Sequence, residues 1–181
     1  MRKVVVPVLA LAFIIACTPT RKTGAIKTRY KVIADTETKV LQGYIDRSVL
    51  EHDTAFKWFA ENLKYGTADP AAVQAFKDNA ASFNVVIFGG TWCHDTQNLL
   101  PVFYRLVEKS GFPEKNITIV ALDRSKNGPD NMTTTYHVTN VPTFIVMKDG
   151  KEVGRVVEYG KEGQIDKELG EIVAANFGVS N

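Results

Sequence analysis

The spacing of hydrophobic and polar residues changes along the chain, and each spacing predicts one kind of element. Continuous apolar runs are typical of strands covered on both faces. Three such runs lie at Val85–Phe88, Ile117–Leu122 and Thr143–Met147. Apolar residues three and four apart form one face of a helix. This spacing predicts a helix over 95–110 and a last helix that carries Ile165, Leu169, Ile172 and Val173.

Weaker signals complete the second half of the chain. A short helix is expected over 131–137, and Asp149-Gly150 is a hairpin signal that leads into a strand over 152–157. From residue 84 onward the expected order is therefore strand, helix, strand, helix, strand, strand, helix. Alternating strands and helices are typical of an α/β fold.

The segment 30–83 has a pattern of its own. We expect short strands over 30–34 and 39–45, and then two helices. The first is capped by Asp53 and the second begins at Asp69-Pro70. Their expected inner faces are Phe56, Phe59, Ala60 and Leu63, and Val73, Phe76 and Ala80.

The first residues have the layout of a secretory leader. Arg2 and Lys3 precede an apolar run over 4–16, which is shorter than the roughly 20 residues that cross a bilayer. The end of the run, Ile14-Ile15-Ala16-Cys17, resembles the lipobox of bacterial lipoproteins. The resemblance implies that residues 1–16 are a signal peptide, that Cys17 is lipidated, and that 17–29 form a tether. The protein would then be anchored in the bacterial cell envelope, facing the periplasm or the exterior. The alternative is that Cys17 lies in an uncleaved or conventionally cleaved leader.

Composition excludes several classes of protein. The 181 residues are 45% hydrophobic and 23% charged, which is ordinary globular usage. After removal of the leader, 20 basic residues would face 20 acidic ones, so we expect no nucleic-acid binding. One free cysteine and three scattered histidines do not supply zinc-ligand spacing, so no metal and no other cofactor is expected. With Cys17 lipidated, Cys93 would be the only free thiol, and an unpaired cysteine in an exported protein suggests reactivity.

Four features in the second half occur together in one family. Trp92-Cys93 stands at the first strand-to-helix turn, Pro101 follows eight residues after the cysteine, Val141-Pro142-Thr143 enters the third strand, and the segment 148–152 forms the hairpin. This combination resembles the thioredoxin superfamily over about residues 84–176. The resemblance implies a central mixed sheet flanked by helices over 84–177, with residues 30–83 as an N-terminal strand and helix extension. It also implies a cis bond at Pro142.

Two departures from the thioredoxin pattern bear on function. The motif reads Cys93-His94-Asp95-Thr96, so the second cysteine of the family's Cys-x-x-Cys is replaced by Thr96, as in a bacterial thioredoxin-like subgroup with Trp-Cys-x-Asp-Ser/Thr. The matching position of the family's buried carboxylate is Ile87. A disulfide between Cys93 and a substrate would therefore wait for an external thiol, because only a thiolate displaces it.

The resemblance assigns roles to the residues around the thiol. Cys93 would be the nucleophile, and a helix N-terminus favours its anionic form. Thr96 would donate a hydroxyl hydrogen bond to the sulfur. His94 would help when charged, or would only face solvent. Asp95 would oppose the thiolate unless it caps the helix, and we expect it to act as a helix cap rather than as a proton shuttle. Trp92 would partly cover the thiol, or it would serve only as a packing residue.

The third-strand segment completes the expected site. Pro142 would shape a substrate groove, and Val141 and Thr143 would offer main-chain groups to an extended substrate. The leading hypothesis is a lipid-anchored monothiol thiol-disulfide oxidoreductase or isomerase. It would act on proteins or small molecules that carry thiols or disulfides, and it would need an external reductant. The alternatives are an inert buried Cys93 and a non-catalytic thioredoxin-fold module that binds proteins.

Overall fold

The computed structural model describes residues 27–178, so the expected leader and Cys17 lie outside the described part. Six strands form one sheet in the order β1-β2-β4-β3-β5-β6. The strands are β1 Arg29–Ile33, β2 Val40–Ile45, β3 Asn84–Gly89, β4 Ile117–Ala121, β5 Thr143–Lys148 and β6 Lys151–Val157. The α-helices are α1 Arg47–His52, α2 Lys57–Asn62, α3 Pro70–Asp78, α4 His94–Ser110, α5 Met132–Thr135 and α6 Ile165–Phe177. Three short 3-10 helices are η1 Thr54–Phe56, η2 Glu114–Asn116 and η3 Pro129–Asn131.

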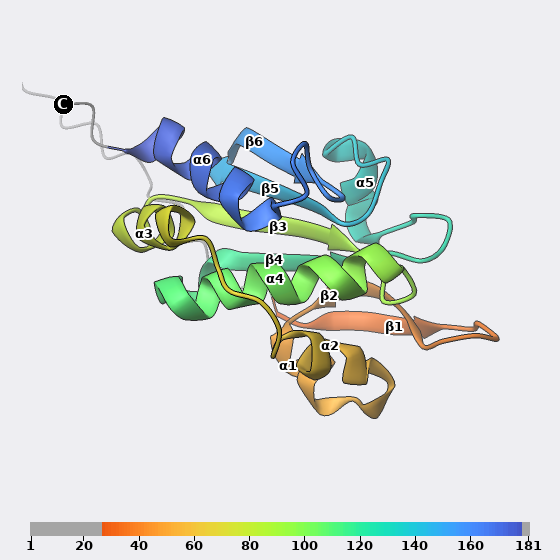
Figure 1. Ribbon diagram of the computed structural model, residues 1–181. Helices are drawn as coiled ribbons and strands as arrows, with labels where there is room; N and C mark the ends of the chain where they lie inside the picture. Colours follow the sequence, from red (N-terminus) through yellow and green to blue (C-terminus); the bar gives the residue numbers. More distant parts are fainter. Residues whose placement is uncertain (1–26, 179–181) are drawn as a thin grey trace, which may run out of the picture.

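The sheet is mixed, as the thioredoxin resemblance implies. Strand β3 runs parallel to β4 and antiparallel to β5, and the pairs β1·β2, β2·β4 and β5·β6 are antiparallel. The order of elements from residue 84 onward is the expected one, so the prediction of an α/β fold is confirmed. Because β3 and β4 are parallel neighbours, their carboxyl ends lie at the same edge of the sheet (Figure 1).

Helices cover the two faces of the sheet unequally. Successive side chains of a strand point to opposite faces, and in β3 Val85 and Ile87 enter a large core while Val86 and Phe88 enter a smaller one. Side chains of α1, α2, α3, α4 and α6 build the large core. The small core packs against Met132 of α5, and Figure 1 shows α4 lying along the opposite face of the sheet.

The segment after β2 differs from the expected single helix. An unexpected helix α1 comes first, and Asp53 then caps the 3-10 helix η1 rather than an α-helix. Phe56 leaves helical geometry, with φ −113° and ψ 33°, before α2 begins. The break changes the helical register, so Phe56 and Phe59 are buried as expected whereas Ala60 is exposed. The helix that begins after Asp69 is confirmed, and Asp69 accepts a hydrogen bond from the Ala72 N–H.

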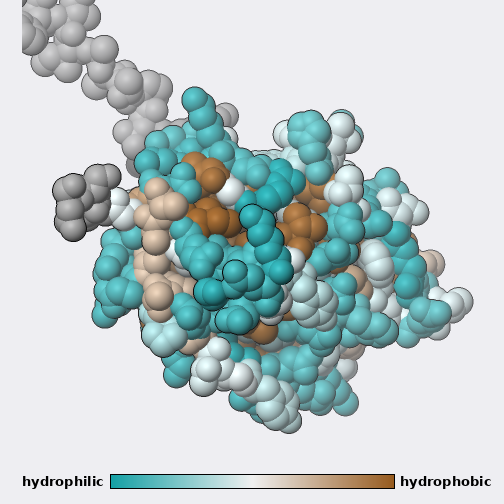
Figure 2. Space-filling model, turned by 45° about the horizontal axis from the view of Figure 1, so that its top comes forward, coloured by the Kyte–Doolittle hydropathy of each residue, from teal (hydrophilic) through white to brown (hydrophobic). Residues whose placement is uncertain are grey.

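One face of the molecule is mainly polar. Figure 2 shows that the side lying at the top of Figure 1 is mostly hydrophilic, with apolar side chains reaching the surface in small separate patches. Tyr159 and Val157 are two exposed apolar residues that follow or end β6. Within residues 27–178, no helix combines the length and the apolar character that crossing a bilayer requires.

Candidate active site around Cys93

The turn between β3 and α4 places Cys93 at a helix N-terminus. Strand β3 ends at Gly89, and Cys93 is the N-cap residue of α4. Its N–H donates to the Gly90 carbonyl over 2.9 Å, and its own carbonyl accepts the Gln97 N–H over 3.0 Å. The thiol is free and half-buried. Unpaired backbone N–H groups and the helix dipole at this end favour a negative charge on the sulfur.

The segment that contains Pro142 lies beside this sulfur. The Val141-Pro142 peptide bond is cis, as the resemblance implies. The Cys93 thiol donates a hydrogen bond to the Val141 carbonyl over 3.4 Å. The carbonyl of Pro142 accepts the Glu158 N–H over 2.7 Å. Two segments 48 positions apart thus meet at the thiol.

Thr143 does not offer an open strand edge. It is in register with Phe88 of β3 on one side and with Val157 of β6 on the other. Its hydroxyl donates to the Asn140 carbonyl over 2.7 Å. Thr143 therefore lies inside the sheet, whereas Val141 precedes β5 and its carbonyl accepts the hydrogen bond from the Cys93 thiol.

Thr96 is buried and faces the end of β3. Its hydroxyl oxygen accepts the Gly90 N–H over 3.2 Å, and a Cβ added at Gly89 would lie 2.9 Å from its methyl carbon. In residues 27–178, the expected hydroxyl bond from Thr96 to the Cys93 sulfur does not form. Thr96 instead holds the turn between β3 and α4, because its side chain points back to the strand end.

Trp92 is held in place by polar and steric contacts. Its indole N–H donates to the Leu122 carbonyl over 2.9 Å, and the Arg124 guanidinium lies 5.5 Å from the ring centroid. A Cβ at Gly90 would come within 2.6 Å of the indole, so only glycine allows this close approach. Trp92 is half-buried and packs, together with Cys93, against the smaller core. Trp92 therefore packs against the smaller core and also borders the Cys93 thiol.

Neither His94 nor Asp95 caps α4. Cys93 occupies the N-cap position without a side-chain hydrogen bond, so the expectation that Asp95 caps this helix is wrong. Asp95 lies in the first turn, where the helix dipole favours its negative charge. His94 is exposed. Both residues border the cavity described next.

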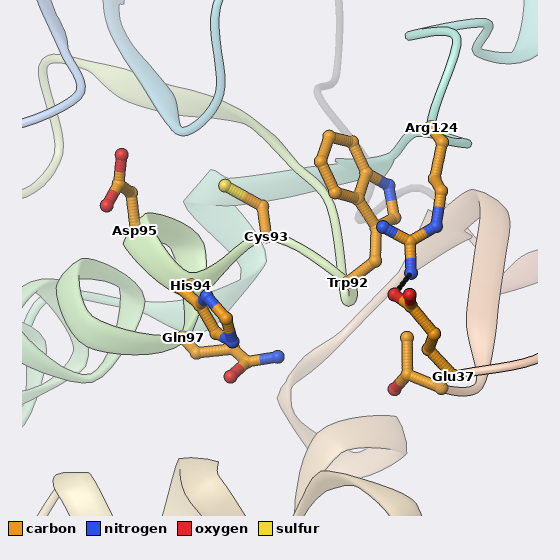
Figure 3. Close-up of a pocket in the computed structure, with 8 residues that line it drawn as sticks. Glu37, Trp92, Cys93, His94, Asp95, Gln97 and Arg124 are labelled. Atoms are coloured by element: carbon orange, nitrogen blue, oxygen red, sulfur yellow. Dashed lines mark hydrogen bonds and ion pairs between the residues drawn. The ribbon is translucent and has the colours of Figure 1, made fainter.

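An open cavity of about 570 Å³ lies in front of the thiol (Figure 3). Four expected site residues line it, namely Trp92, Cys93, His94 and Asp95. Four other lining residues were not expected from the sequence, namely Glu37, Thr38, Gln97 and Arg124. Thr96, Val141, Pro142 and Thr143 are not among the lining residues.

A network of ion pairs on Arg124 forms one side of this cavity. Its guanidinium contacts the carboxylates of Asp35, at 2.6 Å, and Glu37, at 2.7 Å. The hydrogen bond from Arg124, followed by those from the N–H groups of Glu37 and Thr38, holds the pKa of Asp35 well below its usual range. The hydrogen bond to the Asp35 carboxylate in turn raises the pKa of Arg124. The turn between β1 and β2 is thereby bonded to Arg124, whose guanidinium lies over the Trp92 ring.

The active-site turn is also bonded directly to β2. The buried Thr91 hydroxyl donates to the Lys39 carbonyl over 2.9 Å and accepts the Leu41 N–H over 3.2 Å. The N-terminal hairpin of β1 and β2 thus contacts the turn through Thr91 and through Arg124. Within residues 27–178, no cluster of three or more His, Cys, Asp or Glu side chains is placed to hold a metal ion.

One of the unexpected residues carried a signal in the sequence. Arg124 follows the carboxyl end of β4, and ligands of α/β sheets bind beyond the carboxyl ends of the strands. Since β4 is the parallel neighbour of β3, this rule places Arg124 near Cys93. Glu37 and Thr38 carried no comparable signal, because they lie in the turn of a distant hairpin.

Solved structures support the fold. An HIV epitope scaffold aligns with a TM-score of 0.53 at 16% identity, over 76% of this chain and 94% of its own. A protein of unknown function from Pseudomonas aeruginosa aligns with a TM-score of 0.52 at 15% identity, over 72% and 90%.

Sequence comparisons address the family. Thioredoxin from Staphylococcus saprophyticus is 35% identical over 85 residues, which are 46% of this chain and 77% of the relative. Thioredoxin from Chlamydia trachomatis is 37% identical over 83 residues, which are 45% of this chain and 76% of the relative. The Thioredoxin family model matches residues 70–171, which include Cys93 and the cis-proline segment. The chain therefore belongs to the thioredoxin family.

Proposed function

We propose that this protein is a monothiol thiol-disulfide oxidoreductase or isomerase that acts through Cys93. The observation that carries the proposal is a half-buried thiol at the N-terminus of α4, 3.4 Å from the Val141 carbonyl and open to a cavity. Membership of the thioredoxin family supports oxidoreductase chemistry on thiols or disulfides.

The first step is thiol-disulfide exchange. The Cys93 thiolate attacks one sulfur of a substrate disulfide, a new sulfur-sulfur bond forms, and the other substrate sulfur leaves as a thiolate with the electron pair of the broken bond. The proton of the Cys93 thiol goes to solvent. The helix N-terminus stabilises the attacking thiolate, and the Val141 carbonyl orients the neutral thiol before ionisation.

The second step needs a thiol from outside the chain. Thr96 stands where the family has its second cysteine, and its hydroxyl is buried and bonded to Gly90. A hydroxyl at this position does not displace a disulfide. An external thiolate attacks the mixed disulfide and releases Cys93, so turnover depends on an external reductant or on a second substrate thiol.

Trapping of the mixed disulfide tests the proposal. We expect wild-type protein mixed with hydroxyethyl disulfide to form one adduct at Cys93, visible in the intact mass, that persists until a thiol is added. The matched control is Cys93→Ser, which should form none; both proteins carry Cys17→Ser, so that residue 93 holds the thiol under test. Absence of an adduct in folded wild-type protein would contradict the proposal, as would an adduct that decays after the excess disulfide and the released 2-mercaptoethanol have been removed.

A second candidate is a non-catalytic module that binds proteins through the same groove. The Thr96 side chain favours it, because a chain without a resolving cysteine does not run a dithiol cycle alone. Capture of a partner from the native envelope discriminates between the two. Equal capture by wild type and Cys93→Ala supports a binding module, whereas capture that depends on Cys93 and is reversed by a thiol supports the oxidoreductase.

The proposal includes anchoring in the bacterial cell envelope through Cys17. Its support is the sequence pattern of residues 1–17, which lie outside the described part of the structure. Buried acyl chains contribute about 0.8 kcal/mol per CH₂, so lipidation would hold the protein at a membrane. We expect Cys17→Ser to abolish labelling by a fatty-acid probe and to release the protein from membranes. Unchanged labelling would contradict the anchor.

A further inference from the structure

The wall of the Cys93 cavity opposite α4 comes from a segment outside the match to the thioredoxin family. The family model begins at residue 70, whereas Glu37 and Thr38 lie in the turn between β1 and β2. This turn is fixed in position by Arg124, which bonds to Asp35 and Glu37 and lies over the Trp92 ring. The N-terminal extension therefore contributes residues to the wall of the Cys93 cavity.

Negatively charged side chains outnumber positively charged ones around the Cys93 thiol. Glu37, Asp95 and Arg124 are the charged residues that line the cavity, counting His94 as neutral. Arg124 also pairs with Asp35, whose side chain is only 12% exposed. The cavity lining and the ion pairs that border it thus contain three carboxylates and one guanidinium, and only Asp35 and Glu37 contact that guanidinium. In Figure 3, Asp95 lies on one side of Cys93, and Trp92, Arg124 and Glu37 lie on the other.

The excess of negative charge affects anionic and cationic substrates differently. Asp95 and the Arg124–Glu37 pair line the cavity on the two sides of Cys93, so a charged group that enters the cavity beside a bound sulfur lies near these side chains. A cationic group next to that sulfur gains Coulomb energy from the carboxylates, and an anionic group loses it. The guanidinium does not offer a free anion site, because carboxylates occupy it from both Asp35 and Glu37.

We propose that the Cys93 cavity selects disulfides and thiols whose sulfur is flanked by cationic groups, such as Lys- or Arg-flanked cysteines in proteins. It discriminates against anionic thiols of the glutathione type. Glu37 and Asp95 are the specificity residues, and Arg124 is a positioning residue that holds Glu37 at the cavity. The inference rests on the proposed function of Cys93 as nucleophile and names the class of its substrate.

Rates of exchange with three small disulfides test this selectivity. The probes are cystamine, which is cationic, hydroxyethyl disulfide, which is neutral, and dithiodiglycolate, which is anionic. In each exchange the Cys93 thiolate bonds to one sulfur and expels the other as a thiolate. Each rate is divided by the rate of the same disulfide with 1-thioglycerol, a neutral thiol that differs from all three leaving groups, which removes differences in intrinsic reactivity. We expect a normalised preference of about tenfold for the cationic over the anionic probe at low salt.

Salt and matched variants separate the charge effect from other causes. The preference should fall to about twofold or less near 1 M salt, where charges are screened beyond about 3 Å. Glu37→Gln and Asp95→Asn should each lower the preference, and the double variant should remove most of it. The control Glu171→Gln removes a carboxylate on α6 whose side chain is 62% exposed and which does not line the cavity, so the preference should not change.

The outcomes distinguish this inference from the proposed function. Equal normalised rates for all three disulfides, or a cationic preference that neither salt nor the double variant reduces, would overturn the selectivity and leave the role of Cys93 intact. Failure of all three disulfides to react with Cys93 would overturn the proposed function and the selectivity together.

Discussion

At the scale of single residues, the departure from a dithiol thioredoxin that most affects the proposed chemistry is Thr96. Thr96 occupies the position of the second cysteine and is buried, and its oxygen accepts the Gly90 N–H. The position is one helical turn beyond Cys93, where side chains three residues apart are neighbours. A sulfur at position 96 would therefore stand within reach of Cys93, and without it the proposed cycle would depend on an external thiol.

Restoring a cysteine at this position should restore internal resolution. We expect Thr96→Cys to form an intrachain disulfide with Cys93 and to release bound substrate at least about 100-fold faster than wild type, because the second attack becomes intramolecular. The measurement is the lifetime of the mixed disulfide with hydroxyethyl disulfide, by mass spectrometry. Thr96→Ser is the control and should keep the long lifetime. An unchanged lifetime in folded Thr96→Cys would contradict this geometry.

At the scale of elements, contacts between helices can require a residue that intrinsic helix propensity disfavours. Gly170 lies inside α6, where alanine would ordinarily favour the helix by about 1 kcal/mol. A Cβ there would lie 2.5 Å from both Cα and Cβ of Ala72, at the contact between α6 and α3. The glycine allows the two helices to approach closely.

Substitution at this helix contact should therefore destabilise the protein. We expect Gly170→Ala to lower the free energy of unfolding by about 1–3 kcal/mol, since the two backbones must separate. Urea denaturation followed by circular dichroism measures the change. The neighbouring Glu171→Ala, on an exposed position, should stay within about 0.5 kcal/mol of wild type. A Gly170→Ala variant more stable than wild type would show that the helices are not in close contact.

The ion pair between Lys39 and Asp53 should make the free energy of unfolding depend on pH in the acidic range. The hydrogen bond from Lys39, then that from the Ala55 N–H, lowers the pKa of Asp53 below its ordinary 3.8. A lowered pKa stabilises the fold above pH 3.8, and this stabilisation disappears as the pH falls through the folded-state value. We expect Asp53→Asn to be less stable than wild type at pH 7, with a difference that vanishes in stronger acid. A difference independent of pH, measured by urea denaturation, would argue against the pair.

At the scale of the whole molecule, the N-terminal hairpin and the family-matched part form one site. Thr91 bonds to the main chain of Lys39 and Leu41, and Arg124 bonds to Asp35 and Glu37. These contacts join strands β1 and β2 to the turn that carries Cys93. The extension is therefore part of the active-site architecture.

Loss of the Thr91 hydroxyl should loosen this connection. We expect Thr91→Val to cost about 1–3 kcal/mol of stability, because the Leu41 N–H remains buried without its acceptor. Hydrogen exchange measured by mass spectrometry should show faster exchange in β1, β2 and the 34–39 turn than in β5. Thr91→Ser keeps the hydroxyl and should exchange like wild type. Equal acceleration in every strand would indicate general destabilisation instead of a local link.

Local patterns were sufficient for most of the elements. Continuous apolar runs predicted β3, β4 and β5, and helical spacing predicted α4 and α6, because these elements bury a face whose period is visible in the sequence. The split between η1 and α2 was missed, since Phe56 and Phe59 are both buried whether or not the helix is continuous. The motif at Cys93 and the cis bond at Pro142 were predicted through the thioredoxin resemblance.

The remainder of the site depended on contacts between distant segments. Arg124 and Asp35 are 89 positions apart, and no periodicity or motif relates them. The sequence determined that a cysteine with threonine in place of a second cysteine stands at a helix start, because the residues of that turn are consecutive. The tertiary structure decided which charges face the thiol, because the strand order brings the β1–β2 turn and the end of β4 to the same edge of the sheet as Cys93. It also decided the orientation of Thr96, whose hydroxyl oxygen accepts the Gly90 N–H.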